Sequence, residues 1–320
     1  MKVTTGFIVA VLGIGFAPVW LAGCAGTVAG TGVPPAAVRL ANTRGGPRSR
    51  GTLLYVESNG SGQSVDILSY PHGLLVNEIS GIGPVDGMCA DLSGNVWVVV
   101  LDDTVYEFPH AGTSPIAQVT VPDTWLATGC AVDSKTGDLA VINYGGPYGS
   151  SVDVWSSYQG SPTIYPTSFK PWAVTYDGSG DLFADGSTGN SSDFFLLGEL
   201  ASGQSAFQAI QLDKVADWPG GLQWDGKHLV LGTGGRSLTQ RTYQIAVSGS
   251  SATVVRTIRF AHMAKQPYMA WIHGDTIISD EGEHQGFQLA FWRYPKHGKP
   301  YKVLTDYSGR GVVSVAPPAR

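Results

Sequence analysis

The chain has 320 residues, of which 25 are acidic and 20 basic, and charged residues make up 14% of it. This charged fraction is about half the usual one, whereas the 43 glycines are roughly twice the usual number. Such a composition excludes intrinsic disorder and a coiled coil, and an aromatic content of 10% is enough for a full hydrophobic core. Abundant glycine without a collagen period predicts many short strands joined by tight turns.

The N-terminal segment has the features of a secretory signal peptide. Lys2 precedes an apolar run over residues 6–22, which ends at Leu21-Ala22-Gly23-Cys24. This tetrapeptide resembles the lipobox of bacterial lipoproteins, and the resemblance implies cleavage before Cys24 and a diacylglycerol on the Cys24 thiol. The alternative is an uncleaved membrane anchor with an incidental cysteine, which a glycine-rich run near the minimum spanning length disfavours.

Residues 24–50 contain mainly small residues and proline, with four arginines and no acid, and we expect them to form a flexible tether. Ala25 stands where an Asp tends to retain a lipoprotein at the inner membrane, so the outer membrane is favoured. The predicted organisation is a signal peptide over residues 1–23, a lipidated cysteine and tether over 24–50, and one domain over 51–320. That domain would lie outside the cytoplasm, in the cell envelope.

The predicted domain is acidic, with 15 basic against 25 acidic residues, so nucleic acid is not expected as a partner. The charge is uneven, because residues 51–210 hold 17 acids and 2 bases whereas residues 211–320 hold 8 acids and 13 bases. One interpretation is a polar face that orients the domain against a charged partner or surface. The other is unselected variation in a solvated surface.

An internal repeat runs through the domain. Five segments each combine a short apolar strand, a turn of Asp and Gly and a second strand, and their turn glycines are Gly94, Gly137, Gly180, Gly226 and Gly274. The spacings of 43, 43, 46 and 48 residues match the period of a four-stranded propeller blade. The turn carboxylates of the first four segments recur too regularly for a metal site, so we interpret them as Asx-type turns.

The first and last strands complement each other. The domain opens on a second strand, residues 52–57, and closes on a first strand, residues 312–316. The C-terminal strand is therefore expected to complete the N-terminal blade and to close the ring. The predicted fold is all-β, a six-bladed β-propeller with four-stranded blades. Residues 194–218 form the weakest repeat, and a helix there is the alternative.

The turn pattern of Asp, Gly and Asn or Asp before an apolar strand resembles the NHL-repeat and gluconolactonase-like six-bladed propellers. Tyr-Pro and Phe-Pro turns at Tyr70, Phe108 and Tyr294 also resemble those of bacterial propeller lipoproteins. The resemblance covers residues 52 to 317 and implies the fold more than an activity.

The default site of a propeller is the rim of its channel, at the loops that lead into the innermost strands. Polar residues and aromatic rings gather there, and the predicted ligand-binding residues are Asp86, Trp125, Thr128, Trp172, Trp218, Tyr268 and Arg310, with Glu281 and His284 from the acidic loop at residues 280–284. The aromatic faces could stack a sugar ring or hold a peptide; the alternative is packing between blades.

The resemblance to gluconolactonase-like enzymes implies a divalent metal on this rim, held by Glu, Asn and Asp. Asp86 matches the segment that carries the family's Asp and is a weak metal candidate, but the other rim positions lack the required ligands. Acidic and amide side chains of nearby loops could still reach inward: Asn143, Asp185, Asp280, Glu281 and Glu283. Calcium or another divalent metal is therefore the alternative to having no cofactor.

With Cys24 assigned to lipid, Cys89 and Cys130 remain as an even pair in an oxidising compartment. They stand two and three residues before the Asp of their turns, on adjacent innermost strands. We expect these offsets to point the side chains to opposite faces of blades that lie too far apart for a bond. The prediction is two buried free thiols, with a disulfide as the alternative.

The predicted function is a lipid-anchored binding module that works through its channel face as a monomer. Its partner would be an envelope protein, a glycan or a small molecule, and it would touch the membrane through the anchor alone. The alternative is an enzyme, a metal-dependent hydrolase of the lactonase type.

Overall fold

The computed structural model describes residues 51–58, 63–146, 149–188, 195–216, 218–234, 241–264, 270–280, 288–307 and 313–315. All of them belong to one compact unit, Pro34–Arg320. Within these ranges the only helix is a single 3-10 turn, η1 (Ser156–Tyr158). No helix in this part of the chain is long and apolar enough to cross a membrane. The predicted signal peptide, Cys24 and the tether lie outside the described residues.

Four sheets contain four antiparallel strands each. In order across each sheet, they are β24 (Val313–Val315), β1 (Leu53–Glu57), β2 (Ser64–Ser69) and β3 (Leu75–Ser80); β4 (Val85–Ala90), β5 (Val96–Val100), β6 (Thr104–Phe108) and β7 (Ala117–Thr120); β8 (Leu126–Val132), β9 (Leu139–Gly146), β10 (Gly149–Trp155) and β11 (Thr163–Pro166); and β20 (Ala270–His273), β21 (Thr276–Asp280), β22 (Gln288–Arg293) and β23 (Lys302–Thr305).

A fifth sheet has eight strands in two antiparallel halves. They are β12 (Lys170–Tyr176), β13 (Leu182–Ser187), β14 (Phe195–Leu200) and β15 (Gln208–Leu212), followed by β19 (Ser251–Ile258), β18 (Arg241–Ser248), β17 (Leu229–Gly234) and β16 (Trp218–Trp224). The structure therefore has four separate four-stranded sheets and one sheet of eight strands, where six four-stranded blades were predicted. The two halves join because β15 and β19 pair in parallel, Gln211 with Ser251 and Leu212 with Ala252.

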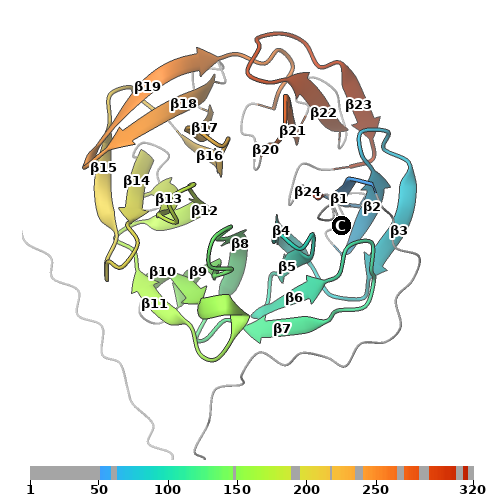
Figure 1. Cartoon of the computed structure of the whole chain (residues 1–320), viewed down its shortest axis with the longest axis horizontal. Helices are drawn as coiled ribbons and strands as arrows, with labels where there is room; N and C mark the ends of the chain where they lie inside the picture. The colour runs from blue at the N-terminus through green and yellow to red at the C-terminus, as the bar shows by residue number, and fades with distance from the viewer. Residues whose placement is uncertain are drawn as a thin grey trace, which may run out of the picture. The chain divides into compact units, whose positions relative to one another are not determined.

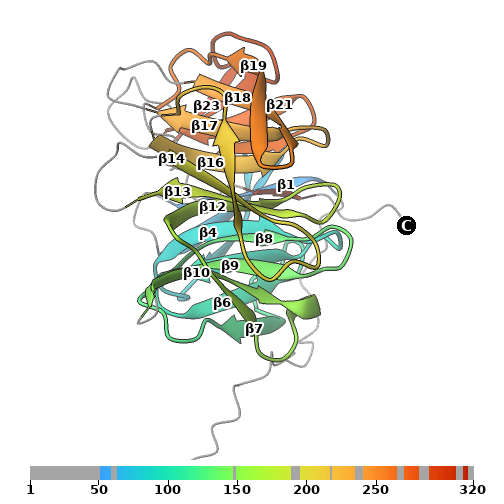
Figure 2. The same cartoon turned by 90° about the vertical axis from the view of Figure 1, so that its left-hand side faces the viewer.

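The sheets are arranged in a ring, and edge strands such as β4, β8, β12 and β16 are turned toward its centre (Figure 1). Seen from the side, the inward strands β16, β12 and β8 follow one another (Figure 2). The fold is a β-propeller, as predicted. The expected ring closure is also confirmed, because the C-terminal β24 pairs with β1 through Leu53 and Val315.

The core lies between the faces of neighbouring sheets. All five residues of β5, Val-Trp-Val-Val-Val, are buried, because its sheet packs against a neighbour on both faces. Trp97 and Trp155 fill the space between the second and third sheets, and Leu54, Ile278 and Phe291 join the last sheet to the first. Such contacts account for the rich supply of β-branched and aromatic residues in the strands.

The repeated carboxylates form Asx-type turns, as predicted. Asp177 Oδ1 accepts backbone N–H groups from Ser179 at 2.6 Å and Asp181 at 3.0 Å, and Asp225 Oδ1 accepts those of Lys227 and His228. Each such turn joins an innermost strand to the second strand of its sheet. The segment at residues 194–218, where a helix was the alternative, contains strands β14 and β15 instead.

Adjacent innermost strands approach closely at Gly87. A Cβ atom on this residue would lie 2.6 Å from the Thr128 carbonyl oxygen and 3.0 Å from the Gly129 Cα. We expect Gly87→Ala to lower the free energy of unfolding by about 1–3 kcal/mol, because β4 and β8 would have to separate. Urea unfolding measures this, with Gly51→Ala as the control, since a Cβ there would meet no atom within 4 Å. Equal losses in both variants would contradict the expectation.

Candidate functional site

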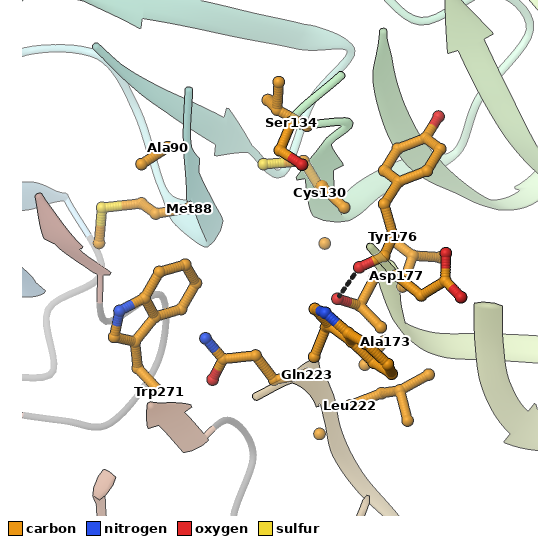
Figure 3. Close-up of a pocket in the computed structure, with 17 residues that line it drawn as sticks. Met88, Ala90, Cys130, Ser134, Ala173, Tyr176, Asp177, Leu222, Gln223 and Trp271 are labelled. Carbon is orange, nitrogen blue, oxygen red and sulfur yellow. Dashed lines mark hydrogen bonds between the residues drawn. The ribbon is translucent and has the colours of Figure 1, made fainter. Parts of the chain in front are cut away.

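A cavity of about 210 Å³ occupies the central channel. It is lined by the innermost strands β4, β8, β12, β16 and β20, in the half of the channel nearer the Asx-type turns. Trp271 and Met88 lie on one side of it, Tyr176 and Asp177 on the opposite side, and Gln223 between them (Figure 3). Side chains from five innermost strands thus meet around one space.

The cavity exists because the strands carry small residues where they face it, among them Ala90, Gly129, Ala131, Ala173 and Gly221. Larger apolar groups, including Met88, Leu222, Trp224 and Trp271, complete most of the wall. Among the described residues that line the cavity, Asp177 is the one acidic residue and none is basic. Burial raises the pKa of the Tyr176 phenol, which keeps this hydroxyl neutral. The site therefore suits an uncharged, mainly apolar group.

The Gln223 side chain fixes the wall between β16 and β20. Its Oε1 accepts the backbone N–H of Ile272 at 2.5 Å, and its Nε2 donates to the carbonyl of the same residue at 3.2 Å. Both ends of the amide are occupied, so Gln223 positions the strand beside Trp271. Its role in the cavity is structural support more than recognition.

Cys89 and Cys130 form a disulfide beside the cavity, with a Cα–Cα distance of 5.7 Å. The prediction of two free thiols is wrong for two physical reasons. Neighbouring sheets pack face to face, so opposite faces of equivalent strands point toward each other. The strands also carry irregular register, between Val85 and Gly87 in β4 and between Ala127 and Cys130 in β8, which helps to bring them together.

The predicted rim residues that the structure describes lie at the starts of the innermost strands, outside the cavity lining. Asp86 and Thr128 lie near the starts of β4 and β8 and are half-buried. Trp172 and Trp218 meet edge to face with ring centroids 6.3 Å apart. Trp125 is 76% exposed, and its ring lies against Gly145. These positions form a second candidate surface, and its ligand-binding role stays a prediction.

Four predicted site residues, Tyr268, Glu281, His284 and Arg310, lie outside the described residues. Among the residues that the structure does describe, no group of three His, Cys, Asp or Glu side chains could hold a metal ion. Of the loop candidates, Asn143 and Asp185 are buried within strands β9 and β13. The predicted calcium alternative finds no ligand set in this part of the chain.

Asp185 is a fully buried carboxyl group in β13, where sequence reasoning expected a loop residue. Its Oδ1 accepts the Ala173 backbone N–H at 2.9 Å, opposite an irregularity in β12, and its Oδ2 has no hydrogen-bond partner. Burial raises the pKa of Asp185 to about 8, so that part of the population is protonated at neutral pH. The signal for this burial was its place inside an apolar strand.

The sequence analysis did not predict the cavity-lining residues, because the predicted site consists of large polar and aromatic residues. The available signal was the small residue at inward positions of successive repeats, such as Ala131 and Ala173. A repeat that fills these positions with alanine or glycine leaves space in the channel. Sequence spacing cannot show how much space, because that depends on how far apart the sheets stand.

A scan of protein-family models gives no match, and no curated protein matches the sequence. Solved structures do resemble the fold. One from a nidogen/laminin complex has a TM-score of 0.64 and 13% identity and covers 84% of this chain and 100% of that chain. A protein of unknown function from Bacteroides caccae has a TM-score of 0.60 and 11% identity, over 83% and 99% of the two chains.

The β-propeller domain of Cps50 (Swd1) from Myceliophteria thermophila has a TM-score of 0.53 and 10% identity, and it covers 85% of this chain and 89% of that chain. Identities this low show a shared propeller fold alone. The predicted NHL-repeat and gluconolactonase-like relationship therefore remains a hypothesis.

Proposed function

We propose that this protein is a lipid-anchored, extracytoplasmic six-bladed β-propeller that binds a small ligand in its central channel. Six blades result when each half of the eight-stranded sheet counts as one. Each half has four antiparallel strands and its own innermost strand, β12 or β16, at the channel. The parallel contact between β15 and β19 covers only two residue pairs and lies at the outer edge.

The main support for the binding role is the mainly apolar cavity at the meeting point of five innermost strands. Its volume of about 210 Å³ is sufficient for a compact organic molecule or for one large side chain of a partner protein. Apolar walls favour an uncharged ligand, because a charged group would lose its hydration there.

The proposed location draws support from two independent features. The lipobox-like segment ending at Cys24 implies export and attachment to a membrane, with the outer membrane favoured. A disulfide between Cys89 and Cys130 is typical of an oxidising compartment outside the cytoplasm.

A polarity-sensitive, uncharged naphthalene dye such as prodan tests the cavity. We expect saturable fluorescence enhancement at one site per chain, weakened about tenfold or more by Ser134→Trp. Ser134 is exposed and lines the cavity, so an indole there narrows the opening without entering the core. Ser205→Trp, in the exposed turn between β14 and β15, is the matched control and should bind like the parent. Unchanged binding in Ser134→Trp would remove the cavity from the proposal.

The metal content of the purified protein distinguishes the proposed binding module from the alternative, a metal-dependent hydrolase. We expect no stoichiometric divalent ion, and thermal unfolding that is the same in calcium and in chelator. A bound ion together with a melting temperature that falls in chelator would favour the enzyme, and Asp86→Ala would then show whether the rim holds the metal.

A further inference from the structure

The outer edge of the first sheet is apolar and exposed to solvent. Leu74, Leu75 and Val76 are consecutive and are 68%, 62% and 44% exposed, at the start of the outermost strand β3. In the last sheet, Tyr301 and Val303 are 45% and 41% exposed at the outermost strand β23. An exposed apolar surface of this kind usually marks an interaction site.

Contacts between the two sheets make these residues parts of one surface. The Lys302 ammonium group donates to the Pro71 carbonyl, from β23 to the loop that precedes β3. In the same loop, a Cβ atom on Gly73 would lie 2.8 Å from the Leu304 Cδ2 atom. β3 and β23 are also neighbours at the outside of the ring (Figure 1). We call this surface, from Leu74 to Val76 and from Tyr301 to Val303, the apolar edge.

Basic residues precede Tyr301 in the sequence and follow it, at the β23 half of the apolar edge. Lys296 and Lys299 are exposed in the segment between β22 and β23, and Lys302 opens β23. Arg293, at the end of β22, pairs with Asp275 at 3.1 Å. Because residues 51–320 are acidic as a whole, this is a local basic region on an acidic domain. A negatively charged surface would therefore attract this region and repel much of the rest.

The chain enters the domain at the same place. The Thr52 carbonyl accepts the backbone N–H of Tyr70 at 3.0 Å, one residue before Pro71. The proposed tether from Cys24 to Arg50 has 27 residues, and a glycine-rich random coil of this length would have an r.m.s. span of about 30 Å. With lipid on Cys24, the apolar edge would remain close to the bilayer, at a high effective concentration.

We propose that the apolar edge docks on the surface of an anionic lipid bilayer, with its leucines in the interface and its lysines on the phosphate groups. This inference rests on the proposed lipid anchor, and it goes beyond the expectation that the anchor alone touches the membrane. Docking would fix the domain in one orientation, with the first and last sheets against the lipid. The affinity of the leucines and lysines for the bilayer is not sufficient by itself for stable attachment, so the lipid anchor and the apolar edge act together.

Vesicle binding by the mature chain, residues 24–320 with Cys24→Ser, measures docking without the anchor. This chain contains the whole compact unit Pro34–Arg320. We expect it to partition about tenfold more onto vesicles of equal parts phosphatidylglycerol and phosphatidylcholine than onto phosphatidylcholine alone, and to dissociate at high salt. Lys296→Glu with Lys299→Glu should abolish the difference between the two lipids.

The double variant Leu74→Ser with Leu75→Ser should reduce partitioning about tenfold or more. Ile164→Ser with Val255→Ser is the matched control, because these residues are 48% and 50% exposed on the outermost strands β11 and β19 of other sheets. Circular dichroism checks that all variants fold. The control variant and the parent should partition onto the vesicles to the same extent.

Three results would overturn the proposal: no vesicle binding by the parent, equal loss in the leucine and control variants, or self-association in sedimentation that the leucine variant removes while vesicle binding stays the same. The last would assign the edge to a second copy of the chain. Failure of the anchor itself is seen separately, in the mass of the N-terminal peptide of the chain produced with native Cys24.

Discussion

Raising the pH from about 4 to about 8 is expected to reduce the free energy of unfolding through one residue, Asp185. Its carboxyl group is fully buried, and burial raises its pKa from 3.8 to about 8. Between these values the folded state holds a proton that the unfolded state releases, so stability falls as the pH rises and levels off above about 8. The slope is at most about 1.4 kcal/mol per pH unit, or about 5 kcal/mol over the interval.

Urea unfolding at a series of pH values measures this effect. Asp185→Asn removes the titrating group and keeps the acceptor for the Ala173 N–H. The free energy of unfolding of the variant, relative to that of the parent, should therefore increase steadily as the pH rises toward 8. Asp153→Asn is the comparison variant, because Asp153 is also fully buried and burial raises its pKa too, but both of its carboxylate oxygens accept hydrogen bonds, from Ser151 and Asn143, so its pH-dependent gain in stability should be the smaller of the two. A stability difference between parent and Asp185→Asn that does not vary with pH would contradict the assignment.

Reduction of the Cys89–Cys130 disulfide is expected to lower the free energy of unfolding by about 3–4 kcal/mol. The bond joins residues 41 positions apart, and its loss restores conformational freedom to that loop in the unfolded chain. It also joins β4 to β8, beside the cavity, so reduction should weaken binding of the naphthalene dye. Denaturant unfolding with and without a phosphine reductant measures the loss of stability.

The control is Cys89→Ala with Cys130→Ala, whose unfolding should be insensitive to the reductant. Thiol labelling of the unfolded, unreduced chain gives an independent reading, since neither Cys89 nor Cys130 should react. Labelling of both cysteines, together with an unfolding midpoint that the reductant does not change, would restore the free-thiol prediction.

The repeat of apolar strands and Asp-containing turns was sufficient to predict the propeller. The predicted opening strand over residues 52–57 matches β1, and the predicted Asx-type turns are present at Asp177 and Asp225. Ring closure followed from the complementary first and last strands. These features are local, or they follow from the need to pair every strand. The periodicity of the sequence is therefore sufficient to predict them.

Features that depend on contacts between repeats were not predictable in this way. The join between β15 and β19 requires two outer edges to meet, which no turn motif encodes. The disulfide joins β4 and β8 of two neighbouring sheets and depends on how these sheets face each other. The cavity depends on small residues such as Ala131 and Ala173, whose significance appears only when innermost strands from five repeats are placed around one channel.

The proposed attachment to a membrane, and with it the high effective concentration of the apolar edge at the bilayer, depends on processing at Cys24. Mass spectrometry of the N-terminal peptide, from protein produced in a bacterium with two membranes, tests this most directly. We predict that the mature chain begins at Cys24 and carries a diacylglycerol on its thiol. A chain that retains residues 1–23, or that begins at an unmodified residue, would contradict the lipid-anchored assignment.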